Sequence, residues 1–379
     1  MLFPGIASGM AESLVIDAKE GKGLPIWPVA NDESTVMVED PSDLIIANTY
    51  AFGAQDFDTK GALATMLHGA DNPDTHIRLY AERPGLRDYL KRGYIPEGPL
   101  TTGSASITLE DANADFAISQ FCRALGQSGC ADRFLARSAN WRKLFNPNTK
   151  YIRARDQSGV FLSGFSPDKT TGFVEGNAAQ YTWMVPYDLP AVIQSLGGPD
   201  AANARLDDYF SKYGEWTGSG YTPHFFISNE PSFGNPWIYN WTGHPWQTQK
   251  VVRKTRDELF TDTAGGLPGN DDLGATSAWV VFGYLGIYPA IPGVGGFTLS
   301  TPIFPTVNLS LGEHDLLISA DVAPNRTYIE SVWLDGVAIS NWWVGWEQLK
   351  RAKELHYGLR DEPNSDSGER PPSFPPQPR

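Results

Sequence analysis

Two adjacent carboxylates, Asp271 and Asp272, lie between glycines in the stretch GLPGNDDLGATSAW (266–279). At neutral pH the two carboxylates repel each other, and the preceding glycines lose much backbone entropy on ordering. The stretch is therefore costly if it is only a turn. Two interpretations stay open from the pattern: the aspartates cap a helix that starts at Leu273, or they perform acid–base chemistry in a pocket.

A second loop offers the same residue types. The stretch GFVEGNAAQYTWMVPYD (172–188) places Glu175 shortly before Gln180, Tyr181 and Trp183. Glycoside hydrolysis needs one carboxyl group that stays protonated and a second one that stays ionised. Glu175 is a candidate for one of these roles, or else a solvated loop acid.

A third loop, FFISNEPSFGNPWIYNWTGHPWQTQ (225–249), brings Asn229 and Glu230 among aromatic and proline residues and ends at Gln249. Carboxylate and amide oxygens are the ligands that calcium prefers in proteins. Acids, amides and aromatic platforms together form the composition of a sugar pocket. The three loops therefore predict a carbohydrate site in which Asn229 and Glu230 can bind calcium.

Several familiar catalytic motifs are absent from the sequence. It contains no HExxH, no GxSxG elbow, no P-loop, no GxGxxG that opens a helix and no paired CxxC. The six histidines are scattered along the chain. The sequence therefore disfavours a metal held by imidazole or thiolate.

Two patterns of hydrophobic spacing divide the chain. Up to about Pro292 apolar residues recur at i, i+3 and i+4, which indicates short helices arranged as a helical toroid or bundle. The expected helices are Gly9–Lys19, Pro41–Ala54, Asp58–His68, Gly85–Lys91, Ser104–Leu125, Ala131–Phe145, Asp188–Ser195, Ala201–Lys212, Pro245–Thr261 and Asp272–Leu285. After PGVGG (292–296) period-2 stretches predict strands: GFTLST, TVNLSL, DLLISADV, YIESVWLDG and VAISNWWV.

Length and charge limit the classes of protein that fit. At 379 residues the chain exceeds the roughly 250–300 residues at which one hydrophobic core stops growing. The net charge of −14 argues against nucleic acid or an anionic membrane as a partner. No apolar run reaches the length of a membrane span, and the first residues lack the pattern of a signal peptide.

Cys122 and Cys130 are the two cysteines of the chain. On one continuous helix they would stand about 12 Å apart, too far for a disulfide. Gly126 and Gly129 can break the helix between them. The spacing therefore favours two free thiols in a helix hairpin and leaves a small disulfide open.

The three loops also carry a family resemblance. The stretches EGNAAQYTWMVPYD, NEPSFGNPWIYNWTGHPWQTQKVVR and GLPGNDDLGATSAWVVFGYLGIYPAIPG closely resemble motifs of glycoside hydrolase family 92, the calcium-dependent exo-acting α-mannosidases. The resemblance runs over nearly the whole chain. It implies a mainly α fold, an (α/α)6-barrel-type toroid, and a reaction that inverts the anomeric carbon.

The resemblance assigns roles to residues. Glu175 corresponds to the general acid and Asp272 to the base that activates water, while Asn270 stands where some members carry an assisting aspartate. Asn229 and Glu230 correspond to the calcium and sugar ligands. The substrate-binding residues expected from the motifs are Gln180, Tyr181, Trp183, Asn229, Glu230 and Gln249.

The mechanism makes two demands on the structure. Inversion needs a water between base and sugar, so the carboxyl carbons of Glu175 and Asp272 should stand roughly 6.5–9.5 Å apart. Glu175 must also stay protonated, and we expect Tyr181 and Trp183 to give it dry, aromatic surroundings.

Family members are about twice as long as this chain. From the resemblance we expect the amino-terminal β-sandwich and the first barrel helix to be missing from this chain, and the toroid to be incomplete at its start. We predict an incomplete helical catalytic domain (1–295), a β-rich region (296–362) and a proline-rich tail (363–379). Expected partners are a mannose-terminated glycan and a separate amino-terminal half or sandwich domain. The family is usually secreted or exported, so the compartment of a chain without a signal peptide stays open.

Three functions follow from these observations. The first is an inverting exo-α-mannosidase that removes terminal mannose, α-1,2-linked, from N-glycans or mannan. The second is an inactive remnant that binds carbohydrate with calcium. The third is an N-glycan-releasing amidase, which the sequence supports least because neither cysteine lies near the three motifs.

Overall fold

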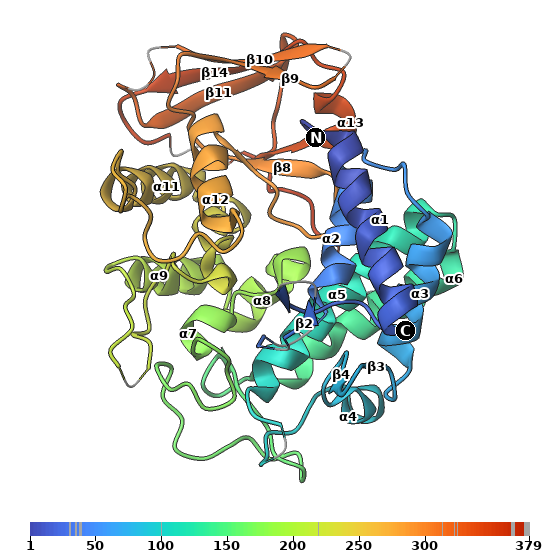
Figure 1. The fold of residues 1–379 in the computed structure, drawn as a ribbon. Coiled ribbons are helices and arrows are strands. Elements are labelled where there is room, and N and C mark those ends of the chain that lie inside the picture. The colour runs from blue at the N-terminus through green and yellow to red at the C-terminus, as the bar shows by residue number, and fades with distance from the viewer. Residues whose placement is uncertain are drawn as a thin grey trace.

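The structure is a computed structural model and describes residues 1–29, 32–34, 36–37, 40–99, 101–218, 220–312, 314–321, 323, 325–364 and 368–374. Helices form the body of the molecule, and a five-stranded sheet covers one end of this body (Figure 1). The helices are α1 (Pro4–Gly21), α2 (Pro41–Ala51), α3 (Thr59–Asp71), α4 (Leu86–Arg92), α5 (Ser104–Ala124), α6 (Ser128–Arg137), α7 (Ala178–Tyr181), α8 (Leu189–Leu196), α9 (Pro199–Tyr209), α10 (Tyr239–Thr242), α11 (Pro245–Leu259), α12 (Ala275–Leu285) and α13 (Trp346–Leu349).

The ten helices expected from the sequence are present. Nine are single α-helices with ends shifted by a few residues, and the expected helix 131–145 is α6 followed by a 3-10 helix, η1 (Ser138–Lys143). A proline in the first turn begins α1, α2, α9 and α11, where its missing N–H costs no hydrogen bond. None of the helices among the described residues has the length and hydropathy to cross a membrane.

α5 is the centre of the helical body. It packs against α2, α3, α6 and η1, and most of its side chains are buried on every face. Its buried Asp115 accepts a hydrogen bond from Arg83 Nη1 at 3.1 Å, and Asp40 and Asp43 pair with the same guanidinium at 3.0 and 2.5 Å. We call Asp40, Asp43, Glu82, Arg83, Asp111, Asp115 and Arg137 the Arg83 cluster.

The β-rich region has one strand that the sequence analysis missed. The five-stranded sheet has the order β12-β11-β14-β10-β9, and β14 lies at its centre, parallel to β10 and antiparallel to β11. The strands are β7 (Ile287–Tyr288), β8 (Gly296–Leu299), β9 (Thr306–Ser310), β10 (Asp315–Ala320), β11 (Tyr328–Leu334), β12 (Val337–Ala338), β13 (Trp343–Gly345) and β14 (Glu354–Arg360). β13, β8 and β7 form a smaller sheet next to the helices.

The remaining strands are two-residue hairpins within the helical part: β1 (Pro28–Val29) with β2 (Asp32–Glu33), β3 (His76–Ile77) with β4 (Tyr80–Ala81), and β5 (Phe145–Asn146) with β6 (Tyr151–Ile152). Three further 3-10 helices lie in the loops: η2 (Pro186–Asp188), η3 (Glu230–Ser232) and η4 (Asn235–Trp237).

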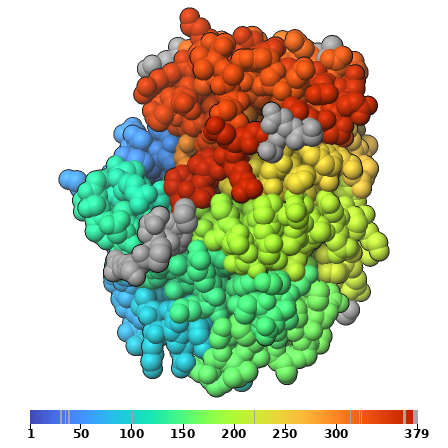
Figure 2. Space-filling model, turned by 180° about the vertical axis from the view of Figure 1, so that it is seen from behind, coloured from blue at the N-terminus to red at the C-terminus, as the bar shows by residue number. Residues whose placement is uncertain are grey.

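The proline-rich tail returns to the helical body. Phe374 donates its N–H to the carbonyl of Tyr187 at 2.8 Å, and its ring lies 5.9 Å from that of Phe116. Trp241 donates its indole N–H to the carbonyl of Pro372 at 3.1 Å. Figure 2 shows this end of the chain, in red, descending from the sheet onto the helices.

The predicted limits of the three regions, at residues 295 and 362, stay predictions.

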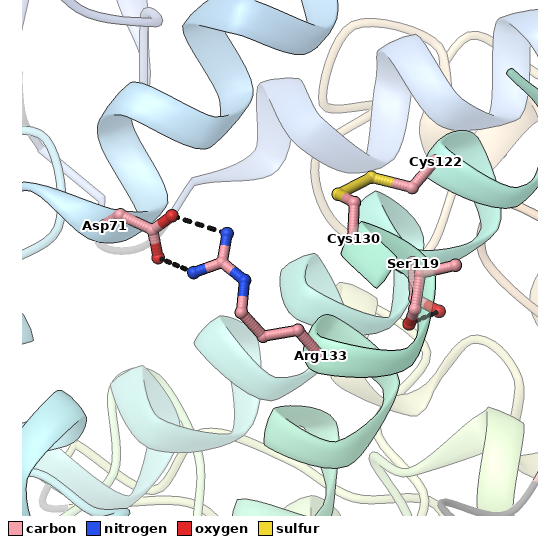
Figure 3. Close-up of a disulfide and its surroundings, with 6 residues drawn as sticks. Asp71, Ser119, Cys122, Cys130 and Arg133 are labelled. Atoms are coloured by element: carbon pink, nitrogen blue, oxygen red, sulfur yellow. Dashed lines mark hydrogen bonds and ion pairs between the residues drawn. A yellow bond between two sulfur atoms is a disulfide. The ribbon is translucent and has the colours of Figure 1, made fainter. Parts of the chain in front are cut away.

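Cys122 and Cys130 form a disulfide, so the free thiols that the spacing favoured are wrong (Figure 3). α5 ends at Ala124 and α6 begins at Ser128, so the chain reverses between the cysteines. This turn brings their Cα atoms to 5.8 Å, within the range that a disulfide can bridge.

Candidate active site

A cavity of about 540 Å³ collects most of the residues predicted to act together. Five predicted site residues line it: Glu175, Asn229, Glu230, Asn270 and Asp272. They come from three loops, which precede α7, lead into η3 and precede α12. The other lining residues are Trp27, Val36, Met37, Trp216, Tyr221, Phe226, Ser228, Gly269 and Leu273.

The two predicted catalytic carboxylates share an unusual backbone conformation. Glu175 and Asp272 both have φ of +47°, and Leu273 has φ of +56°. A positive φ is uncommon outside glycine and costs on the order of 1–3 kcal/mol when the surroundings enforce it. Such strain gathers at functional sites, and here it occurs at two loops that face one cavity.

The adjacent aspartates of the GNDDLG turn have different positions. Asp271 Oδ1 accepts a hydrogen bond from the N–H of Ser277 at 2.9 Å, in the first turn of α12. Asp272 instead lines the cavity. The helix begins at Ala275, two residues later than the start expected at Leu273. The N-cap residue of α12 is thus Gly274, and the side chain of Asp271 only satisfies one N–H of the first turn.

Hydrogen bonds join the three loops to one another. Asn229 donates its side-chain N–H to the carbonyl of Glu175 at 2.6 Å, which links the loop of 225–249 to the loop of 172–188. Ser228 donates its hydroxyl to the carbonyl of Pro268 at 2.6 Å. Gly269, with φ of +94°, passes so close to Ser228 that a Cβ on the glycine would lie 2.7 Å from the serine Cβ. The glycine is thus needed for the close approach of the two loops.

The carboxylates of the cavity crowd one another. Removal from water raises the pKa of Glu230, and the negative charges of Asp272 and Glu175 and a hydrogen bond with Asp272 raise it further. Burial and the charges of Asp111 and Glu230 raise the pKa of Glu110, on α5, to about 8. None of the described residues that line the cavity is Lys, Arg or His. The repulsion between these carboxylates therefore favours protonation of one of them or binding of a cation in the cavity.

Comparison with known proteins identifies the family. The model of the glycosyl hydrolase family 92 catalytic domain matches residues 1–361. This chain belongs to glycoside hydrolase family 92.

Solved structures of family 92 resemble the chain along almost all of its length. The inverting mannosidase BT2199 of Bacteroides thetaiotaomicron is 27% identical, with a TM-score of 0.89 over 98% of this chain and 53% of its own. The α-mannosidase BT3965 of the same organism, in complex with mannoimidazole, is 25% identical, with a TM-score of 0.90 over 99% and 51%.

A curated relative is an uncharacterized secreted glycosidase of Arthroderma benhamiae, 26% identical over 86% of this chain and 45% of its own length. The chain thus spans about half the length of the relatives that it matches.

The residues of the cavity include oxygen ligands of the type that calcium prefers, but fewer of them than calcium needs. No group of three or more His, Cys, Asp or Glu side chains suited to a metal occurs within the part of the chain that the structure describes. Asn229 and Glu230 supply amide and carboxylate oxygens, whereas calcium takes six to eight oxygen ligands. The sugar, water or another chain segment would have to complete such a site.

Four of the residues predicted to bind substrate do not line the cavity. Gln180 forms a capping box with Asn177 at the start of α7 and donates to the carbonyl of His224 at 3.3 Å. Gln249 Oε1 accepts the N–H of Ile329 at 3.0 Å and so ties α11 to β11. Their polar side-chain atoms thus hold parts of the fold together.

The surroundings of Glu175 also differ from the expectation. Tyr181 donates its hydroxyl to the carbonyl of Val174, and Trp183 is buried in the main hydrophobic core. Neither ring lines the cavity, and the Glu175 residue is exposed. Tyr221 does lie near Glu175, because burial raises the pKa of Tyr221 and the negative charge of Glu175 raises it further.

The sequence analysis missed the apolar wall of the cavity. Trp27, Val36, Trp216 and Leu273 are 40%, 66%, 56% and 100% exposed although they are large and apolar. A signal was present for one of them, because Trp216 and Tyr221 bracket the glycine-rich turn in GEWTGSGY. Which way the two rings point depends on contacts that local sequence does not encode.

Proposed function

We propose that this chain carries the catalytic centre of an inverting exo-α-mannosidase that removes terminal, α-1,2-linked mannose from N-glycans or mannan. One observation carries the proposal: Glu175 and Asp272 reach one cavity from separate loops, each on a strained residue. The two solved family 92 structures that resemble this chain are mannosidases, which supports the proposal.

In the proposed reaction Glu175 donates its proton to the glycosidic oxygen while the bond from the anomeric carbon to that oxygen breaks. Asp272 takes a proton from a water molecule that attacks the anomeric carbon from the opposite face. The water oxygen remains on the sugar and its configuration inverts. We assign the amide of Asn270, which lines the same cavity, to hold that water.

Asn229 and Glu230 are the residues that would hold calcium and the mannose hydroxyls. When bound, calcium would supply Lewis-acid and orienting chemistry at these hydroxyls. Three crowded carboxylates without a basic side chain among the described lining residues support a cation at this place.

A second protein segment would complete the molecule. At the start of α1, Ile6, Met10 and the preceding Phe3 are 61%, 63% and 67% exposed, while Ala11 and Val15 of the same helix are fully buried. An exposed apolar patch of this kind marks an interaction surface. This surface supports an amino-terminal half or sandwich domain as partner. Without that partner, we expect copies of the chain to associate with one another.

An exported location is part of the proposal. The relative from Arthroderma benhamiae is described as secreted, and the disulfide between Cys122 and Cys130 suits an oxidising compartment. The same disulfide removes both thiols from consideration as nucleophiles, which argues against an amidase of the cysteine type.

The deciding experiment measures mannose release from α-1,2-mannobiose, with calcium and with chelator. We compare the full chain with Asp272→Asn and, as a matched control, Asp271→Asn, which can still accept the N–H of Ser277. We expect release that needs calcium, is lost in Asp272→Asn and persists in Asp271→Asn. Equal release by both variants would contradict the assignment of the base.

The same experiment separates the second candidate, an inactive carbohydrate-binding remnant. The exposed apolar residues at the start of α1 favour that candidate for the chain on its own, because they indicate that a partner segment is needed. Calcium-dependent binding of mannobiose without release, by protein shown to be folded, would establish it.

A further inference from the structure

A short hairpin at the rim of the cavity holds an exposed tryptophan in a fixed place. Trp216 and Tyr221 pair as an antiparallel bridge, and Thr222 donates its N–H to the carbonyl of Glu215 at 3.1 Å. The rings of Trp216 and Tyr221 lie 5.0 Å apart. Trp216 is 56% exposed, although tryptophan is usually well buried. The hairpin therefore holds an aromatic face open to solvent.

This hairpin is attached to the loop of the proposed general acid. Asn177, two residues after Glu175, donates its side-chain N–H to the carbonyls of Tyr221 and Thr222 at 2.9 and 3.2 Å. The same side chain caps α7 by accepting the N–H of Gln180. One residue thus fixes the distance between the acid loop and the aromatic hairpin. The hairpin lies on the side of the cavity where Glu175 acts.

The chemistry of the reaction says what occupies that side. A general acid must stand next to the glycosidic oxygen, and the group beyond this oxygen is the leaving group. The base, Asp272, acts at the anomeric carbon from the opposite face. An aromatic surface beside Glu175 therefore borders the leaving group and not the mannose that is released.

We propose that Trp216 stacks on the sugar ring of the leaving group, so that residues 215–218 and 220–222 form a leaving-group subsite that favours glycans over simple mannosides. The inference rests on the proposed function, because it takes Glu175 as the acid. Covering one indole face with a sugar removes on the order of 60 Å² of apolar surface from water, which corresponds to roughly tenfold in affinity.

The test compares two ligands on the full chain. Calorimetry in the presence of calcium measures the affinities for methyl α-mannoside and for α-1,2-mannobiose, both in an Asp272→Asn background that prevents turnover. The variants are Trp216→Ala, Trp216→Phe and, as a control, Trp246→Ala on α11, which contacts His244 and does not line the cavity.

We expect the parent to bind mannobiose about tenfold more tightly than methyl α-mannoside. Trp216→Ala should lose this preference, Trp216→Phe should retain part of it, and Trp246→Ala should retain all of it. Methyl α-mannoside occupies only the mannose side, so its affinity should be similar in all four proteins.

Two other results would overturn the inference in different ways. If methyl α-mannoside binds and the preference for mannobiose is absent, or survives Trp216→Ala, the subsite is wrong while the proposed function stands. If neither sugar binds to protein with a native circular dichroism spectrum, the proposed function fails and the subsite fails with it.

Discussion

The Arg83 cluster and the cavity both gather several acidic side chains, but the two sets differ in the charges that surround them. In the cluster, Asp40, Asp43 and Asp115 are fully buried and share the guanidinium of Arg83, and Arg137 binds Asp115 as well. Burial of a carboxylate costs free energy that a paired cation offsets. This cluster joins α2 and α5 at the centre of the helical body.

In the cavity, Glu175, Glu230 and Asp272 lie without a basic side chain among the described lining residues. Two of them occupy backbone conformations that raise the energy of the folded chain. The contrast suggests how to separate structural from functional acids in this chain. Acids that share a buried arginine stabilise the fold, whereas acids at a strained turn without a basic neighbour among the described lining residues are placed for a substrate or an ion.

The largest expected effect is on activity. Asp272→Asn should lower mannose release by roughly 10²–10⁴-fold, because a general base is lost. It should leave the melting temperature unchanged or raised, since asparagine tolerates a positive φ and no longer repels Glu230. Mannose release and thermal unfolding, measured on the same preparation, check both parts. A large loss of stability would place Asp272 with the structural acids.

Glu175→Gln tests the other half of the cavity. We expect a loss of similar size on α-1,2-mannobiose, whose leaving group needs a proton, and a much smaller loss on an aryl mannoside with an acidic phenol. The ratio of kcat/KM for the two substrates, in variant and parent, is the measurement. Equal losses on both substrates would argue against Glu175 as the acid.

The Arg83 cluster should respond in the opposite way. Arg83→Met leaves several buried carboxylates without their cation and should lower the free energy of unfolding by about 3–5 kcal/mol. Arg87→Met is the matched control, because the exposed pair of Arg87 and Asp74 contributes only about 0–1 kcal/mol. Urea unfolding measures both. A small effect at Arg83 would remove the distinction between the two sets of acids.

Much of the architecture could be predicted from local sequence. The helices follow from apolar spacing and from prolines that fit a first helical turn, and β9, β10 and β11 follow from alternation. β14 shows the same alternation, with Leu355, Tyr357 and Leu359 buried between more exposed residues, so the sequence analysis missed a strand that this local pattern indicates. Its place at the centre of the sheet depends on a parallel pairing with β10 that no local signal reveals.

Long motifs in the sequence predicted most of the acids and amides of the site. Residues whose role depends on the direction of the side chain were harder to predict. The motifs brought together the five acids and amides of the cavity. Gln180 was assigned to the substrate, although the pattern Asn177-Ala-Ala-Gln180 already indicates a capping box in which Asn177 is the N-cap. Trp216 lies between the motifs, and its position depends on the bonds of Asn177 to the hairpin. Tertiary contacts of this kind determine which residues of a loop meet the substrate.

The smallest predicted effect concerns the pH dependence of stability within the Arg83 cluster. Burial, together with the charge of Asp40, raises the pKa of Glu82 to about 9. The folded protein therefore holds a proton that the unfolded chain releases above its ordinary pKa of about 4.5, so stability falls as the pH rises from 4.5 toward 9. Glu82→Gln keeps the shape of the protonated acid and cannot lose that proton. We expect its melting temperature to fall less between pH 5 and pH 8.5 than that of the parent, with the exposed Glu347→Gln as control. If the melting temperature of Glu82→Gln falls as much as that of the parent, Glu82 is already ionised in the folded protein. Arg83 and Arg137 would then balance its charge, and no proton would be held at Glu82.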